Sequence, residues 1–113
     1  KPMDELEFSD ISALAYDERR GLFALSNKGY LFNLDLQVEQ KKIKRLDLKE
    51  AYILKTKKGK ELKKKKRDSE GMALSQEGLI ISFERRPKVS LYDFKGRKIR
   101  NYPIAQELQE IEN

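Results

Sequence analysis

The chain contains two stretches of similar sequence, and this internal repeat constrains its fold more than any other feature. Residues 10–36 align with residues 68–94 at an offset of 57 or 58 positions. A repeat of this length with several short strands is typical of β-propeller blades, although two unrelated meanders of similar composition are the alternative. The aligned pairs include Asp10 with Asp68, Ser12 with Glu70, Leu14 with Met72, Gly21 with Gly78, Tyr30 with Lys88, and Asp35 with Asp93.

Short runs rich in apolar and aromatic residues make up each repeat. In the first repeat these runs are ISALAYD, LFALSN and YLFNLDL, each bounded by Gly, Asn, Asp or a charged turn. Such runs predict consecutive antiparallel strands. A polar outer strand follows each repeat, because KKIKRL after the first aligns with RKIRNY after the second. The sequence therefore predicts an all-β fold of two four-stranded antiparallel sheets that resemble consecutive propeller blades of an incomplete propeller.

We expect five segments along the chain. The interblade insertion is lysine-rich and predicts either a basic β-hairpin or a helical stretch, exposed in both cases. Tyr92 and Phe94 alternate along the last strand of the repeat and are expected in the core between the blades. The segments are an acidic leading segment at 1–9, a first blade at 10–48, a basic interblade insertion at 49–67, a second blade at 68–104 and an acidic tail at 105–113.

Composition excludes several kinds of chemistry. The chain has no cysteine and no histidine, which removes disulfides, thiolate zinc sites, cysteine nucleophiles and Ser-His triads. A metal would have to be a hard cation such as Ca²⁺ on oxygen ligands. The net charge of +6 is local, because residues 55–67 contain nine basic residues and one acidic residue. No apolar run reaches the roughly 18 to 20 residues of a membrane-spanning helix, so no transmembrane segment is expected.

The second repeat carries a family resemblance. The runs DSEGMA, GLIISFE and RPKVSLYDFKGR resemble the phytase-like family, described as having the esterase-like activity of phytase. The first repeat is similar to the first blade of that family, with Ala13 where the family has Gly and Asn27 where it has Asp. Position 27 thus lacks the carboxylate a metal would need. The resemblance implies a bacterial β-propeller, periplasmic or secreted, with a site at the end of its central channel.

The candidate site lies where the innermost strand of each blade begins. In a propeller these strands line the central channel, so Asp10 and Ser12 of the first blade would meet Asp68 and Glu70 of the second. Glu84 ends the next strand and can reach the same region. Carboxylates that converge in this way can bind calcium or perform acid–base chemistry, and Asp68, Glu70 and Glu84 are the candidate metal ligands. The alternative is that Asp68 and Glu70 only satisfy backbone N–H groups at a turn.

Two basic features are candidates for anion binding. Arg85 and Arg86 follow Glu84 and can hold a phosphate or carboxylate, or can form a solvated loop. The lysine run at 55–67 can bind a polyanion by charge, or can be a solvated loop between blades. It has no interleaved aromatic residues for base stacking, so nucleic acid is not the expected partner.

Three functions are compatible with these features. The first is a part of a phytase-like propeller that performs calcium-supported phosphoester or ester hydrolysis. The second is a non-catalytic propeller module that binds a ligand or a protein, and the third is a polyanion-binding protein that uses the lysine run. Two blades cannot close a ring that needs roughly four to eight, so the expected partners are the missing blades of a longer chain or other copies of this one. We expect this chain alone to be inactive.

Overall fold

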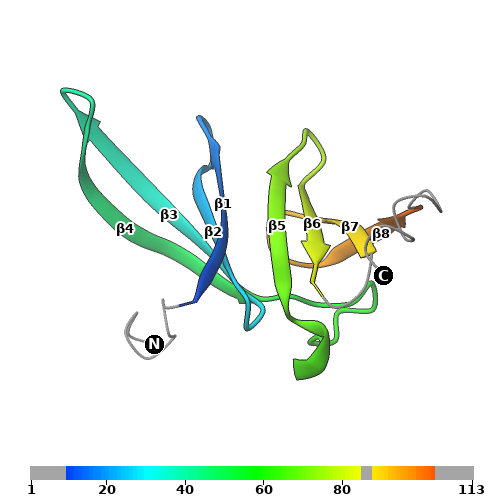
Figure 1. Ribbon diagram of the computed structural model, residues 1–113. Helices are drawn as coiled ribbons and strands as arrows, with labels where there is room; N and C mark the ends of the chain where they lie inside the picture. Colours follow the sequence, from blue (N-terminus) through cyan, green and yellow to red (C-terminus); the bar gives the residue numbers. More distant parts are fainter. Residues whose placement is uncertain (1–9, 85–87, 104–113) are drawn as a thin grey trace.

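The computed structural model describes residues 10–84 and 88–103, and its strands form two antiparallel sheets (Figure 1). Each sheet has four strands in chain order, β1-β2-β3-β4 and β5-β6-β7-β8. The predicted fold class is therefore confirmed. The first sheet consists of β1 (Ile11–Asp17), β2 (Gly21–Ser26), β3 (Tyr30–Glu39) and β4 (Lys42–Ile53); the second consists of β5 (Ser69–Leu74), β6 (Leu79–Phe83), β7 (Lys88–Tyr92) and β8 (Lys98–Tyr102).

The sequence repeat is reproduced in the backbone. The pairing of β1 with β2 is irregular between Ile11 and Ala13, and the pairing of β5 with β6 is irregular at the equivalent positions, Ser69 and Gly71. The hydrogen bonds at the open ends of the β1–β2 and β5–β6 hairpins are equivalent as well. The N–H of Asn27 donates to the carbonyl of Asp10 at 3.0 Å, and the N–H of Glu84 donates to the carbonyl of Asp68 at 2.9 Å.

Glycine is required where the second strand of each sheet begins. Gly21 has a φ of 98°, and a Cβ there would lie 2.5 Å from the carbonyl oxygen of Leu34. A Cβ on Gly78 would collide with the carbonyl oxygen of Tyr92, which occupies the equivalent position in the second sheet. Only glycine lets the neighbouring strand approach this closely.

The outer hairpin of the first sheet is longer than the sequence predicted. Gln40 and Lys41 both have positive φ, 53° and 65°, as in the two-residue turns that favour β-hairpins. The β4 strand then continues to Ile53, which pairs with Tyr30, whereas the sequence placed the end of the first blade at position 48. The outer strands of the first sheet consequently project well beyond the rest of the molecule (Figure 1).

The main hydrophobic core lies between the two sheets. Tyr92 is fully buried in it and Phe94 packs against it, as predicted. A second group of buried residues, Ala24, Phe32 and Leu34, alternates with the core residues along β2 and β3 and therefore lies on the other face of the first sheet. The buried residues of the main core are Phe23, Leu25, Leu31, Leu54, Leu62, Leu79, Ile81, Phe83 and Tyr92.

The segment between the sheets is anchored in this core. Leu54 is 0% exposed and Leu62 is 6% exposed, so the prediction of an exposed insertion is wrong at these two positions. The N–H of Leu54 donates to the carbonyl of Gly29 at 2.9 Å, and the N–H of Leu62 donates to the carbonyl of Leu54 at 3.0 Å. A short 3₁₀ helix, η2 (Lys64–Lys66), leads into β5. No helix within the described ranges is long and apolar enough to cross a membrane.

Candidate functional site

A surface pocket opens where the second strand of each sheet ends. We call it the interblade pocket, and its volume is about 430 Å³. Asn27 follows β2 and Glu84 follows β6, so the repeat brings these two equivalent positions to the same region. Asp68 precedes β5, and the η2 helix supplies two lysines. The lining residues are Asn27, Lys64, Lys65, Asp68 and Glu84.

The charges around the interblade pocket are mixed. Asp68 is half-buried, whereas Glu84, Lys64 and Lys65 are exposed. Two carboxylates can accept or donate a proton, and two ammonium groups can hold the negative charge of a ligand. The Asn27 amide can both donate and accept hydrogen bonds. The pocket therefore has the chemistry to bind an anionic ligand beside an acid–base group.

The two site residues predicted in the first blade have structural partners. Asp10 is exposed, has a φ of 59°, and forms an ion pair with Lys28 at 3.4 Å. The Ser12 hydroxyl donates to the carbonyl of Leu25 at 3.1 Å and lies 3.1 Å from the hydroxyl of Ser69. Neither residue lines the interblade pocket.

Ser12 instead connects the innermost strands of the two sheets. The strands β1 and β5 lie side by side (Figure 1). The Ser69 hydroxyl, which is buried, also donates to the carbonyl of Ser26 at 3.0 Å. This chain of hydroxyl contacts joins the first sheet to the second at the level of the innermost strands.

The remaining predicted site residues do not all lie at the interblade pocket. Glu70 lies within β5, is exposed, and does not line the interblade pocket. Arg85 and Arg86 lie outside the described residues. Of the predicted ligand-binding residues, the structure thus brings together Asp68 and Glu84.

The predicted calcium ligands do not converge as a set. Within residues 10–84 and 88–103, no group of three or more acidic side chains is placed to hold a metal ion. Calcium takes six to eight oxygen ligands, and Asp68 and Glu84 share their pocket with two lysines, whose charge opposes a cation. The described residues therefore do not fit a calcium site built from Asp68, Glu70 and Glu84.

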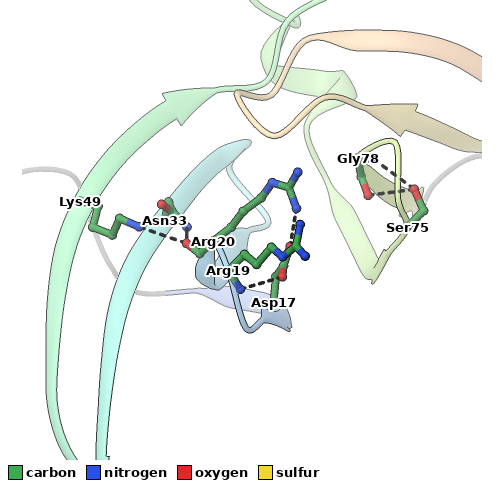
Figure 2. Close-up of polar contacts among 7 residues, drawn as sticks. All are labelled: Asp17, Arg19, Arg20, Asn33, Lys49, Ser75 and Gly78. Atoms are coloured by element: carbon green, nitrogen blue, oxygen red, sulfur yellow. Dashed lines mark hydrogen bonds and ion pairs between the residues drawn. The ribbon is translucent and has the colours of Figure 1, made fainter.

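A second polar cluster lies at the opposite end of the innermost strands, where β1 turns into β2 and β5 turns into β6 (Figure 2). Arg20 forms an ion pair with Asp17 at 2.6 Å, and its guanidinium lies 3.9 Å from the centre of the ring of Phe94, which lies in the turn between β7 and β8. Hydrogen bonds from the Arg19 backbone and from Arg20 lower the pKa of Asp17. Arg20 therefore ties the two sheets together at this end.

We did not expect this cluster from the sequence, although the repeat carries a signal for it. The turn that contains Arg19 and Arg20 aligns with the turn from Ser75 to Gly78, so the repeat alone places the two turns at one end. In the second turn the hydroxyl of Ser75 donates to the carbonyl of Gly78 at 3.0 Å (Figure 2). These contacts close the turns and give the cluster a structural role.

A comparison with protein families gives a match that extends over nearly all of the chain. The family model described as "Phytase-like: Esterase-like activity of phytase" matches residues 6–113. The chain belongs to the phytase-like family. Neither the comparison with curated proteins nor the comparison with solved structures gives a match. The phytase-like assignment thus covers both sheets and the segment between them.

Lys64 and Lys65 line the interblade pocket beside the carboxylates, which the sequence did not predict. The lysine run is a candidate for polyanion binding or a solvated loop in the sequence, apart from the carboxylate site. The sequence does contain a signal for this placement, because the lysine run directly precedes the DSEGMA motif of the phytase-like family. A buried anchor such as Leu62 holds such a run against the site, as observed here.

Proposed function

We propose that this phytase-like chain contributes a site that binds and hydrolyses an anionic ester, and that the site is the interblade pocket. The observation that supports this proposal is the presence of Asp68 and Glu84 beside Lys64 and Lys65 around one pocket. The family description names an esterase-like activity, which agrees with a carboxylate that activates water.

Each pocket residue has a role in this proposal. Lys64 and Lys65 hold the negative charge of a phosphoester or of the carboxylate on an ester substrate. Glu84 accepts a proton from the attacking water, and Asp68, which is half-buried, orients that water or donates to the leaving group. The Asn27 amide donates a hydrogen bond to the substrate.

The proposal extends to the assembly and to its location. The active form contains further blades, supplied by a longer chain or by other copies of this one, because two sheets do not close a propeller. The family resemblance supports the proposal that the assembly works in the bacterial periplasm or outside the cell. Calcium is not part of the proposed mechanism, because the described carboxylates do not converge on a cation.

The test measures hydrolysis of p-nitrophenyl phosphate and p-nitrophenyl acetate by the complete natural product that contains this chain. We expect Glu84→Gln to lower kcat by about 10²-fold or more with little change in KM. Glu18→Gln is the matched control, since Glu18 is exposed in the turn at the opposite end. Equal activity of Glu84→Gln and the control would contradict the proposal. Assays with added calcium and with EDTA reveal any requirement for the ion.

A non-catalytic binding module is the second candidate, and the exposure of Lys64, Lys65 and Glu84 favours it. In that case phenyl phosphate binds, Lys64→Met and Lys65→Met weaken its binding, and no hydrolysis is detected in the complete product. Retention on heparin that depends on Lys63 to Lys66 would instead favour the polyanion-binding function.

A further inference from the structure

A second and more enclosed pocket lies between the interblade segment and the end of the second sheet. We call it the lysine pocket, and its volume is about 90 Å³. It is lined by the segment before β5, the end of β6, both ends of β7 and the start of β8. The lining residues are Thr56, Leu62, Lys66, Asp68, Phe83, Lys88, Tyr92 and Lys98.

Tyr92 lines the lysine pocket and carries an unsatisfied polar atom. The residue is 0% exposed, and its hydroxyl has no hydrogen-bond partner among the residues that the structure describes. A buried hydroxyl without a partner is costly, so such groups mark places where a water or ligand binds. The rest of the Tyr92 ring packs in the core, 6.2 Å from the ring of Phe83, and leaves the hydroxyl as its only polar contribution.

The pocket also gathers like charges. Lys66, Lys88 and Lys98 all line it, and the Lys98 ammonium lies 6.0 Å from the centre of the Tyr92 ring. Burial, a hydrogen bond with Lys88, and the charges of Lys88, Lys66 and Lys57 lower the pKa of Lys98 to about 8. Three ammonium groups around a small enclosed space repel one another, and a negative ligand between them would relieve that repulsion.

From this arrangement we infer that the lysine pocket is a binding site for a doubly charged oxyanion, the phosphate group being the best match. Lys66, Lys88 and Lys98 supply the positive charge, and the hydroxyls of Tyr92 and Thr56 donate hydrogen bonds to the oxyanion. This site is separate from the interblade pocket and does not depend on the proposed hydrolysis.

Charge and size both favour a dianion. Three lysines against the one lining carboxylate, Asp68, leave an excess of two positive charges in the pocket. A phosphate group carries roughly −1.5 to −2 charges at neutral pH. A volume of 90 Å³ is several times the roughly 10 to 15 Å³ that one water needs, so a small tetrahedral anion fits.

The experiment is a calorimetric titration of the chain with sodium phosphate in EDTA, against sodium chloride at equal ionic strength. We expect saturable phosphate binding that chloride does not reproduce. Tyr92→Phe and Lys98→Met should each weaken phosphate binding by about tenfold, because each removes a hydrogen bond to a charged group. Lys42→Met is the control; it removes the same charge from the exposed β3–β4 hairpin.

The outcomes separate specific binding from general attraction to a basic chain. No phosphate binding beyond that of chloride overturns the inference, and so does an equal loss in Lys42→Met and Lys98→Met. If Lys98→Met does not fold, Tyr92→Phe decides, because it removes only the unpaired hydroxyl. Phenyl phosphate distinguishes free phosphate from a phosphate group on a larger molecule. If phenyl phosphate binds and Tyr92→Phe weakens its binding, the site accepts a phosphate carried by a larger molecule. If inorganic phosphate binds and phenyl phosphate does not, the ligand is the free ion.

Because the titration contains EDTA and measures binding alone, its failure would leave the hydrolysis proposed for the interblade pocket untouched. Loss of hydrolysis in Glu84→Gln, conversely, says nothing about phosphate binding in the lysine pocket. The two sites share Asp68 as a wall, so Asp68 variants are unsuitable for either test.

Discussion

Lys98 is the residue whose environment departs most from that of a surface lysine. Its pKa is lowered to about 8 in the folded protein, chiefly by burial and by Lys88. Between pH 8 and its ordinary pKa, the unfolded chain therefore binds more protons than the folded one, and stability rises with pH. Below pH 8 Lys98 is charged in the folded protein, and the full cost of burying that charge beside other lysines lowers the free energy of unfolding.

The resulting prediction concerns the pH dependence of unfolding without phosphate. The free energy of unfolding of the wild type should rise relative to that of Lys98→Met as the pH increases from 8 to 10. Urea melts at several pH values measure this difference. The window ends near the ordinary lysine pKa of 10.5, above which Lys98 is neutral in both states. Burial also raises the pKa of Tyr92, but Tyr92 is present in both proteins and its effect cancels in the difference. Parallel curves for the two proteins would contradict the assigned environment of Lys98.

Gly78 is a second residue with a specific structural demand. A Cβ at this position collides with the backbone of Tyr92, which cannot move without disturbing β7. Gly78→Ala should therefore lower the free energy of unfolding by more than about 1 kcal/mol. Gly71→Ala is the comparison, because its added Cβ would meet only the Ser82 hydroxyl at 3.0 Å, and a side chain can rotate away. An equal or larger loss in Gly71→Ala would show that backbone crowding is not the cause.

Among the elements, the segment between the sheets differs most from its sequence-based description. Its lysines predicted a solvated insertion, and most of them are exposed. Two leucines eight positions apart nevertheless anchor it in the core. A spacing of eight is compatible with both the strand period and the helix period, but the residues between the two leucines are mostly lysines and give neither pattern an apolar face, so the sequence did not reveal the anchor.

Leu62→Ala tests whether that anchor stabilises the molecule. Removing a buried leucine side chain should lower the free energy of unfolding by about 2 to 5 kcal/mol. Leu46→Ala is the control, since Leu46 is 43% exposed on β4 and its truncation should change stability by about 0.5 kcal/mol or less. Chemical denaturation of both variants gives the comparison. Similar values would mean that the segment is not anchored as described.

The strands themselves were predictable because local and repeat signals agree. Apolar runs predicted β1 to β3 and β5 to β7, and the offset predicted which turns are equivalent. The length of the outer hairpin was not predictable in the same way, because residues 37–50 alternate weakly and are mostly polar. Whether these residues form a strand depends on their pairing with β3, and the local sequence alone does not indicate that pairing.

The candidate site was predictable in part for the same reason. Asp68 and Glu84 were identified from motif and repeat, and they line one pocket. Glu70 and Ser12 were placed with them because both sit at the start of an innermost strand. The direction of each side chain depends on the pleat of its strand and on the neighbouring blade. The Ser12 side chain consequently contacts Ser69 and not the pocket. The lysine pocket depends on ends of four segments that are distant in sequence, so no local motif indicates it.

For the whole molecule, the central claim is that the repeats form two sheets whose innermost strands lie side by side. The hydroxyls of Ser12 and Ser69 are 3.1 Å apart across that boundary, and they are separated by 57 positions in the chain. Because the chain has no cysteine, a designed pair has no competing native thiol. The double variant Ser12→Cys with Ser69→Cys should therefore form an intramolecular disulfide without a change of fold.

The decisive measurement is the intact mass of that double variant, as a monomer, after mild oxidation. The account predicts loss of the two thiol hydrogens and complete protection from alkylation. Ser12→Cys with Ser75→Cys is the control pair, because Ser75 lies beyond the far end of β5, and its thiols should stay alkylatable. Free thiols in the Ser12 and Ser69 pair, or cross-linking between molecules in place of the intramolecular bond, would contradict the side-by-side packing of β1 and β5.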